Sequence, residues 1–243
     1  MARPFRNLLR RLGLDYVKAP IEHWRRVAAM LEHAGVTVLL DVGANEGQYV
    51  GYLRNAGWRG RIVSFEPVAA VHTILSANAA RDPAWQVAPP MALGAADGSA
   101  AITVSSESDM SSLLPLRDEI LKVSPSSAAT GQETVEVRTL DAVFDDHVAK
   151  DDVAFLKIDT QGYERAVLEG AVKTLPRLAG MQVELSLTPL YEGEADWRAL
   201  VERIEAAGFS LAFVLPGYYD RHLKRMLQFD GVFMRPADRD AGQ

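Results

Sequence analysis

The sequence of 243 residues contains no cysteine, which excludes disulfides, thiolate metal sites and cysteine nucleophiles. It also lacks any run of about twenty apolar residues, so we expect no membrane-spanning helix. Basic side chains are in deficit, 26 against 32 acidic ones, and the formal charge of −6 argues against a nucleic-acid partner. A content of 48% hydrophobic and 24% charged residues is typical of a folded domain with a full core.

The first thirteen residues, MARPFRNLLRRLG, predict a short basic amphipathic helix, because the apolar and arginine side chains fall on opposite faces at helical spacing. Arginines interrupt each apolar run, so the segment does not have the pattern of a signal peptide, and we predict a cytoplasmic protein. Two interpretations of residues 1–13 stay open. We favour packing on the domain over peripheral contact with an anionic membrane surface.

From Val36 onward, apolar runs alternate with helical patterns, which predicts an α/β fold with a mostly parallel sheet. Several of the runs are apolar on both faces, and this predicts helices on both sides of the sheet. The predicted strands are 36–43, 61–67, 85–93, 153–158, 181–187, 210–215 and 227–234, of which the last folds back. The predicted helices are 48–56, 68–80, 163–175 and 197–207.

Residues 94–150 break this rhythm, and we interpret them as an insertion that carries a hairpin, with strand-like alternation at 101–105 and 134–138. The chain then divides into an N-terminal helical extension (1–35), one main domain (36–235) and a tail (236–243). No internal repeat is evident, and no linker is long enough to split the main domain.

A glycine loop, DVGANEG from Asp41 to Gly47, joins the first predicted strand directly to the next helix. Ligands of doubly wound sheets bind at the carboxyl ends of strands, and glycine allows the backbone to approach them closely. Glu66 ends the second strand about twenty residues later, where a carboxylate accepts hydrogen bonds from both hydroxyls of a ribose. Together these features predict an adenosine-containing cofactor.

Charge indicates which cofactor this is. The loop has two glycines instead of the three of a dinucleotide site, and it carries Glu46. A carboxylate about 4 Å from a phosphate would cost about 4 kcal/mol at an effective dielectric constant near 20. S-adenosylmethionine has no phosphate and brings an ammonium and a sulfonium, which Asp41 and Glu46 attract. An NAD-dependent oxidoreductase is therefore the less favoured alternative.

Eight motifs in order resemble the FkbM-type S-adenosylmethionine-dependent methyltransferases, a branch of the class I, Rossmann-like methyltransferases. They are VLLDVGANEGQY, RIVSFEP, ALGAADG, SSLLP, TLD, FLKIDTQGYERAVLEGA, QVELSLTPLYEG and QFDGVF, and they span about Val36 to Arg235. The resemblance implies a seven-stranded sheet with an antiparallel last strand. It also implies S-adenosylmethionine as the cofactor.

The resemblance further implies which residues surround the cofactor. The methionine end would contact Asp41, Gly43, Asn45 and Gly47, the ribose Glu66, the adenine Ala92 and Leu93, and the transferred methyl group Asp159. Relatives often carry a histidine where Ile120 stands. A non-catalytic module that binds cofactor or glycan is therefore the second hypothesis.

Methyl transfer to a hydroxyl needs a group that takes the proton. Lys157 and Asp159 lie two apart on a predicted strand and share a face, and Asp159, at the carboxyl end, is the favoured catalytic candidate. Glu184 interrupts an apolar strand, so we expect it to face the cleft, with Lys157 as its ion-pair partner or as a substrate contact. For Glu164 two interpretations stay open: a catalytic carboxylate, or a carboxylate that the helix dipole stabilises at the start of the helix. Two carboxylates are weak evidence for a divalent metal, and we predict no metal ligands.

The loop 216–225 gathers tyrosines, an aspartate and His222, a mixture that suits a sugar-like acceptor. His222 is the last catalytic candidate, although a solvated turn is the favoured interpretation. The serine-rich stretch 105–112 predicts a flexible loop or, slightly favoured, a lid over the acceptor. We therefore predict an O-methyltransferase that acts on a hydroxyl of a glycan or a sugar-containing natural product, as a monomer or homo-oligomer.

Overall fold

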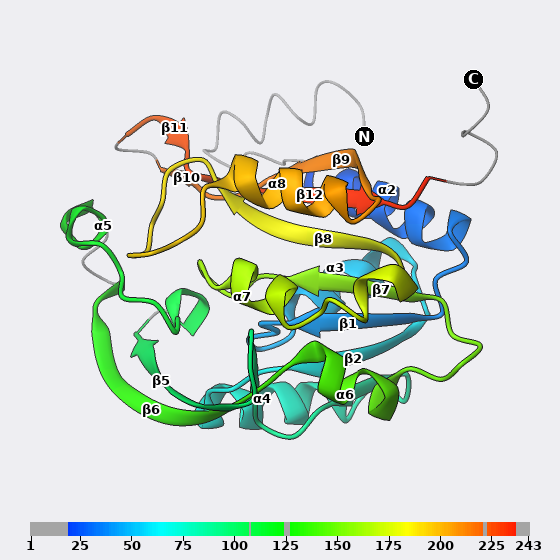
Figure 1. Ribbon diagram of the computed structural model, residues 1–243, viewed down its shortest axis with the longest axis horizontal. Coiled ribbons are helices and arrows are strands. Elements are labelled where there is room, and N and C mark those ends of the chain that lie inside the picture. Colours follow the sequence, from blue (N-terminus) through cyan, green and yellow to red (C-terminus); the bar gives the residue numbers. More distant parts are fainter. Residues whose placement is uncertain (1–18, 107, 124–126, 221–222, 237–243) are drawn as a thin grey trace, which may run out of the picture.

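The computed structural model describes residues 19–106, 108–123, 127–220 and 223–236. Its centre is a seven-stranded sheet with the order β3-β2-β1-β7-β8-β12-β9 (Figure 1). The strands are β1 (Val38–Val42), β2 (Arg61–Phe65), β3 (Trp85–Val87), β7 (Ala154–Ile158), β8 (Leu178–Ser186), β9 (Ser210–Pro216) and β12 (Gln228–Met234). β12 runs antiparallel to β8 and β9, while the other pairs are parallel. This confirms the predicted α/β fold with an antiparallel last strand.

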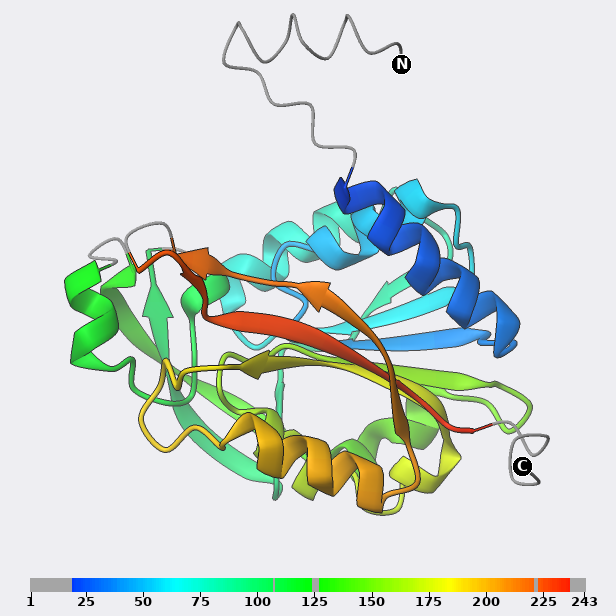
Figure 2. The ribbon, with the colours of Figure 1, turned by 90° about the horizontal axis from the view of Figure 1, so that it is seen from above.

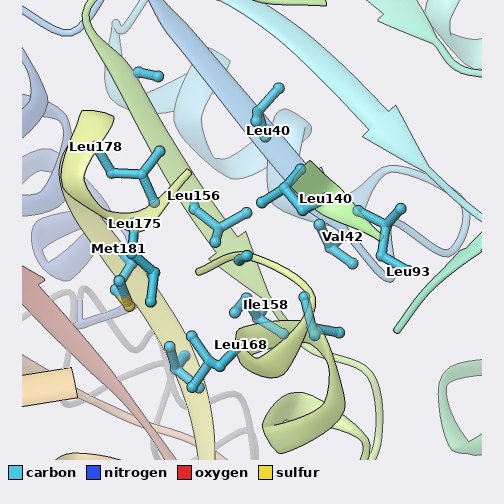
Figure 3. Close-up of a cluster of buried hydrophobic side chains, with 14 of the residues drawn as sticks. Leu40, Val42, Leu93, Leu140, Leu156, Ile158, Leu168, Leu175, Leu178 and Met181 are labelled. Carbon is cyan, nitrogen blue, oxygen red and sulfur yellow. The ribbon is translucent and has the colours of Figure 1, made fainter. Parts of the chain in front are cut away.

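Helices cover both faces of the sheet, as Figure 2 shows with α2 and α3 on one side and α8 on the other. Every residue of β1 and β7 is buried, which explains why these strands are apolar on both faces. One core cluster joins Leu39 and Phe155 to α2 (Ala19–His33) and α3 (Gln48–Ala56). The other joins the opposite face of the sheet to α6 (Leu140–His147), α7 (Glu164–Glu169) and α8 (Trp197–Ala206) (Figure 3).

The predicted strand 85–93 is wrong as a single element. It divides at Pro89 and Pro90, because proline cannot donate a ladder hydrogen bond. Its second part, β4 (Ala92–Leu93), joins a separate three-stranded sheet with β5 (Gly98–Ser105) and β6 (Ala129–Arg138). β5 and β6 form the expected antiparallel hairpin, and α4 (Ala69–Ala79) packs its first turn on this small sheet.

Two further expectations differ from the structure. The helix after β7 is shorter than predicted, since α7 ends at Glu169 and a short 3₁₀ turn, η3 (Leu175–Arg177), follows. The end of segment 94–150 also differs from the expected hairpin insertion, because α6 packs on the large sheet and is part of its core. The remaining elements are η1 (Ser108–Met110), α5 (Asp118–Val123) and the small hairpin of β10 (Tyr219–Asp220) and β11 (Arg225–Met226).

No helix among the described residues is long and apolar enough to cross a membrane. The amphipathic segment 1–13 and the candidate His222 lie outside the described residues.

Candidate active site

A cavity of about 320 Å³ lies where β1, β2 and β7 end. Its walls come from the glycine loop, from the segments after β2 and β7, from β4, and from α2, α3, β8 and β12. The position agrees with the general rule that open α/β sheets bind ligands at the carboxyl ends of their strands.

Close packing against neighbouring residues shapes the glycine loop. Gly43 has φ +74°, and a Cβ there would lie 1.8 Å from the carbonyl oxygen of Asp159. Gly47 has φ +93°, and a Cβ there would lie 2.2 Å from the ring of Trp85. Gly43 lines the cavity, but Gly47 is not among the described residues that do. Gly47 therefore shapes the turn into α3.

Glu66 and Asn45 line the cavity next to each other. The Glu66 carboxylate accepts hydrogen bonds from the backbone N–H of Asn45 at 3.0 Å and of Val68 at 2.9 Å. Burial raises the pKa of Glu66, although these two hydrogen bonds oppose the shift. Asn45 has φ +48°, and its buried side-chain oxygen has no hydrogen-bond partner in the described part of the chain. Both residues line the cavity, and the Glu66 carboxylate keeps lone pairs that can accept hydrogen bonds from a ligand.

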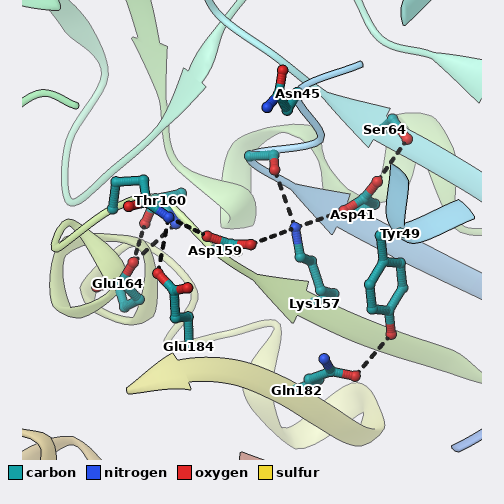
Figure 4. Close-up of polar contacts among 12 residues, drawn as sticks. Asp41, Asn45, Tyr49, Ser64, Lys157, Asp159, Thr160, Glu164, Gln182 and Glu184 are labelled. Carbon is teal, nitrogen blue, oxygen red and sulfur yellow. Dashed lines mark hydrogen bonds and ion pairs between the residues drawn. The ribbon is translucent and has the colours of Figure 1, made fainter. Parts of the chain in front are cut away.

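Lys157 is the centre of a buried charge cluster (Figure 4). Its Nζ lies 3.2 Å from Asp41 Oδ1 and 3.4 Å from Asp159 Oδ2, and it donates to the carbonyl oxygen of Gly43 at 3.1 Å. Burial alone would lower the pKa of Lys157, but Asp41 and Asp159 outweigh it and raise the pKa above its usual value. Lys157 therefore stays charged and cannot act as a base.

Asp41 is the buried carboxylate that pairs with Lys157 in this cluster. It is fully buried, accepts a hydrogen bond from Ser64 Oγ at 3.1 Å, and is not among the described residues that line the cavity. Asp41 is the first residue of the glycine loop, and Lys157 links its carboxylate to the carbonyl oxygen of Gly43 in the same loop.

The partners of Glu184 are two glutamine side chains and not Lys157, the ion-pair partner considered from the sequence. Its carboxylate accepts hydrogen bonds from Gln161 Nε2 at 2.9 Å and Gln228 Nε2 at 2.8 Å, while Lys157 pairs with the two aspartates. Burial, together with the charges of Asp159 and Asp230, raises the pKa of Glu184 well above its usual value. In the described chain Glu184 lies behind Gln161 and does not line the cavity, contrary to our expectation that it faces the cleft.

Glu164 holds the loop that follows β7. Its Oε1 accepts hydrogen bonds from the Thr160 N–H at 2.9 Å, the Thr160 hydroxyl at 3.1 Å and the Gly162 N–H at 3.1 Å. Burial raises the pKa of this carboxyl to about 7. The same loop places Gln161, with φ +55°, so that its Nε2 donates to Asp159 Oδ1 at 2.7 Å. The contacts of Glu164 match the helix-start interpretation.

The remaining predicted residues divide between the cavity and the surface. Ala92 and Leu93 line the cavity from β4, and four residues of the serine-rich stretch line it too: Ser108, Asp109, Ser111 and Ser112. The described part of loop 216–225 does not contribute to the lining. There the Tyr218 hydroxyl donates to Asp220, and Asp220 also accepts from the Leu223 N–H.

The lining residues that were not predicted from the sequence include Trp24, Tyr49, Tyr52, Gln182 and Asp230. The sequence did indicate that Asp230 is unusual, because it is a carboxylate inside the apolar run QFDGVF. The three aromatic residues carried none, because aromatic residues at helical spacing are typical of ordinary core packing. No group of three or more His, Asp or Glu side chains placed to hold a metal occurs among the described residues.

The model of the methyltransferase FkbM domain matches residues 41–211, which is well over half of the sequence. The chain belongs to the FkbM methyltransferase family. The match covers the glycine loop, Glu66, the hairpin and the loop after β7, so most of the cavity of this FkbM domain lies inside it. No curated protein matches the sequence.

Solved structures share the fold of this FkbM domain at low sequence identity. A proposed O-methyltransferase from Klebsiella pneumoniae is 11% identical, with a TM-score of 0.50, over 96% of this chain and 89% of its own. An O-methyltransferase from Bacillus cereus, solved in complex with SAH, is 13% identical, with a TM-score of 0.49, over 94% and 88%. A 1,6-didemethyltoxoflavin-N1-methyltransferase from Burkholderia thailandensis is 13% identical, with a TM-score of 0.45, over 91% and 80%.

Proposed function

We propose that this FkbM domain is an S-adenosylmethionine-dependent O-methyltransferase that methylates a hydroxyl of a glycan or a sugar-containing natural product. The charge of the cavity lining is the observation that carries the proposal. Among the described residues of the lining, Lys157 is the one cation, whereas four carry carboxylates: Glu66, Asp109, Asp159 and Asp230. Such a cavity attracts a sulfonium and an ammonium and repels a pyrophosphate.

The chain has groups that fit each part of this cofactor. The unpartnered Asn45 oxygen offers an acceptor for the ammonium, and the Glu66 carboxylate keeps free lone pairs for ribose hydroxyls. Ala92 and Leu93 supply an apolar surface for the adenine. Bound in this way, S-adenosylmethionine would supply an electrophilic methyl group.

Asp159 is the residue proposed to take the proton from the acceptor hydroxyl. It follows β7, next to Gly43, and its side chain is 31% exposed towards the cavity. Lys157 and Gln161 hold its two oxygens in place. A positioned general base contributes typically 10²–10⁴-fold in rate. Glu184 and Lys157 then act by holding Gln161 and the glycine loop rather than by moving protons.

Calorimetric titration with S-adenosylmethionine, S-adenosylhomocysteine and NAD tests the cofactor, on wild type and Glu66→Ala. We expect the first two ligands to bind and NAD not to bind. Glu66→Ala should weaken binding about 10- to 100-fold, the value of a hydrogen bond to a charged group. Binding of NAD alone would refute the proposal in favour of an oxidoreductase. Turnover is then sought by S-adenosylhomocysteine release with a panel of glycans and hydroxylated natural products.

A non-catalytic binding module is the second candidate, and one observation favours it. Ile120, at the position where relatives often carry a histidine, is buried in an apolar cluster with Leu190 and Tyr191. Turnover with any acceptor, lost in Asp159→Asn while cofactor affinity is kept, would refute the module. Cofactor binding without turnover across the whole panel would support it.

A further inference from the structure

The cavity is longer than the predicted cofactor contacts require. It extends along the edge of the sheet from Glu66, just after β2, to Asp230 in β12, four strands away in the order β2-β1-β7-β8-β12. At about 4.8 Å between strands, this is a span of about 19 Å. The residues proposed to hold the cofactor follow β2, β1 and β7 or lie in β4. The part of the cavity over β8 and β12 therefore remains for a second ligand.

Three aromatic side chains, Trp24, Tyr49 and Tyr52, form a wall of the cavity at this end. Trp24 of α2 stacks on Tyr52 of α3, with ring centroids 4.9 Å apart and an interplanar angle of 19°. Tyr49 meets Trp24 edge-on at 5.2 Å. Tyr52 is 47% exposed although it lines the cavity, so the wall ends in an aromatic surface open to solvent. A stacked pair with one exposed ring, Tyr52, and one half-buried ring, Trp24, at the mouth of a polar cavity is typical of a binding surface.

A polar floor lies beside the wall. The buried Tyr49 hydroxyl donates to Gln182 Oε1 at 3.0 Å, and Gln182 in turn hydrogen-bonds the Asp230 carboxylate. This chain of contacts fixes the Gln182 amide, so Asp230 is the group with capacity to accept hydrogen bonds from a ligand. Burial, with the charge of Asp159, raises the pKa of Asp230 to about 6, and the carboxylate is ionised above that pH.

We propose that the acceptor half of the cavity, defined as Trp24, Tyr52, Gln182 and Asp230, binds a sugar ring whose apolar face lies on the Trp24–Tyr52 stack and whose hydroxyls donate to Asp230. The inference rests on the proposed function and deepens it by locating the acceptor. It assigns this role to α2, α3 and β12 instead of the loop 216–225, whose described residues do not line the cavity.

Two other ligand classes fit these groups less well. A flat apolar ring would stack on the wall, but it would leave the Asp230 carboxylate desolvated without a donor. A quaternary ammonium is usually held by aromatic rings on several sides. Here Trp24 contacts both Tyr49 and Tyr52, so the three rings form one wall. A sugar ring has the required combination of an apolar face and hydroxyl donors at its edge.

Saturation-transfer NMR on the protein loaded with S-adenosylhomocysteine tests this inference. The probes are the methyl glycosides of glucose, galactose, mannose and rhamnose, with choline and 2-naphthol as the competing ligand classes. We expect transfer to the ring protons of at least one glycoside. Tyr52→Ala and Asp230→Asn should each reduce this transfer at least about fivefold. Tyr219→Ala is the matched control, because Tyr219 is 54% exposed and lies in the loop 216–225.

The possible results separate this inference from the function it rests on. If S-adenosylhomocysteine binds in calorimetry but no glycoside shows transfer, the inference fails and the cofactor assignment stands. Transfer that survives both substitutions, or that only Tyr219→Ala removes, also overturns it, as does binding of choline or 2-naphthol alone. If S-adenosylhomocysteine itself does not bind, the proposed function fails first. Trp24→Phe, which keeps an aromatic ring, should retain most of the transfer in a folded protein.

Discussion

The two halves of the cavity are built in different ways. The half proposed for the cofactor is made of backbone turns that Gly43, Glu66 and Glu164 hold in place, and a buried charge cluster supports it. The proposed acceptor half is made of side chains alone, from two helices and two strands. A ligand shared by many enzymes can be held by a fixed backbone frame, whereas an acceptor surface made of side chains can change without disturbing the fold.

Lys157→Met should have the largest effect, because it leaves the fully buried Asp41 without its cation. Breaking a buried ion pair from one side costs about 3–5 kcal/mol of unfolding free energy. Arg165→Met is the control, since its ion pair with Glu169 is exposed and such pairs contribute less than about 1 kcal/mol. Urea denaturation of both variants measures the difference. Equal losses would show that the charge cluster does not support the cofactor half.

Gly43→Ala should come next. The new Cβ would lie 1.8 Å from the Asp159 carbonyl oxygen, at a φ of +74° that alanine rarely adopts. Overpacking and backbone strain together cost about 3 kcal/mol or more. Gly51→Ala in α3 is the control, because no atom lies within 4 Å of the new Cβ and alanine favours a helix by about 1 kcal/mol over glycine. Denaturation curves in which Gly43→Ala is as stable as wild type would contradict the backbone frame.

Glu164 sets a pH dependence in the loop that joins the two halves. Its pKa is about 7 in the folded protein against an ordinary value of 4.5, so the folded state binds more protons than the unfolded state between these values. The contribution of Glu164 to stability is therefore complete below pH 4.5 and lost as the pH rises through 7.

Glu164→Gln should remove this dependence. The unfolding free energy of the variant relative to wild type should rise by up to about 3 kcal/mol from pH 4.5 to pH 8. Glu192→Gln, at an exposed site, is the control. Denaturation at several pH values measures both. A flat difference for Glu164→Gln would mean that this carboxyl does not titrate in the native loop.

Tyr52→Ala should have the smallest effect on the fold. The side chain is 47% exposed, and loss of its stack on Trp24 should cost about 1 kcal/mol. The affinity for S-adenosylmethionine, measured by calorimetry, should stay within about twofold of wild type. A loss of cofactor affinity above tenfold would show that the two halves do not act separately.

Most of the fold was predictable from local patterns. Apolar runs with helical segments between them predicted the strands of the large sheet, although the break at Pro89 and Pro90 and the early end of α7 were missed. The glycine loop and Glu66 were predictable for the same reason, because a strand, a turn and a helix that are adjacent in sequence are adjacent in space.

The rest of the site depended on which strands lie side by side. Asp41, Lys157 and Gln182 stand in one row across β1, β7 and β8, so Lys157 meets Asp41 and not Glu184. The spacing of these residues along the chain does not show which strands pair or in which register.

The fold class and the position of the glycine loop at the end of a strand followed from the amino-acid sequence alone, because backbone conformation follows from residues that are neighbours in the chain. Only the tertiary structure decided that Asp230 lines the cavity while Glu184 does not, and that Trp24 joins Tyr52 at its mouth. These contacts link segments far apart in sequence. They form through the packing of α2 on α3 and the antiparallel pairing of β12 with β8, which bring those side chains within reach of one another.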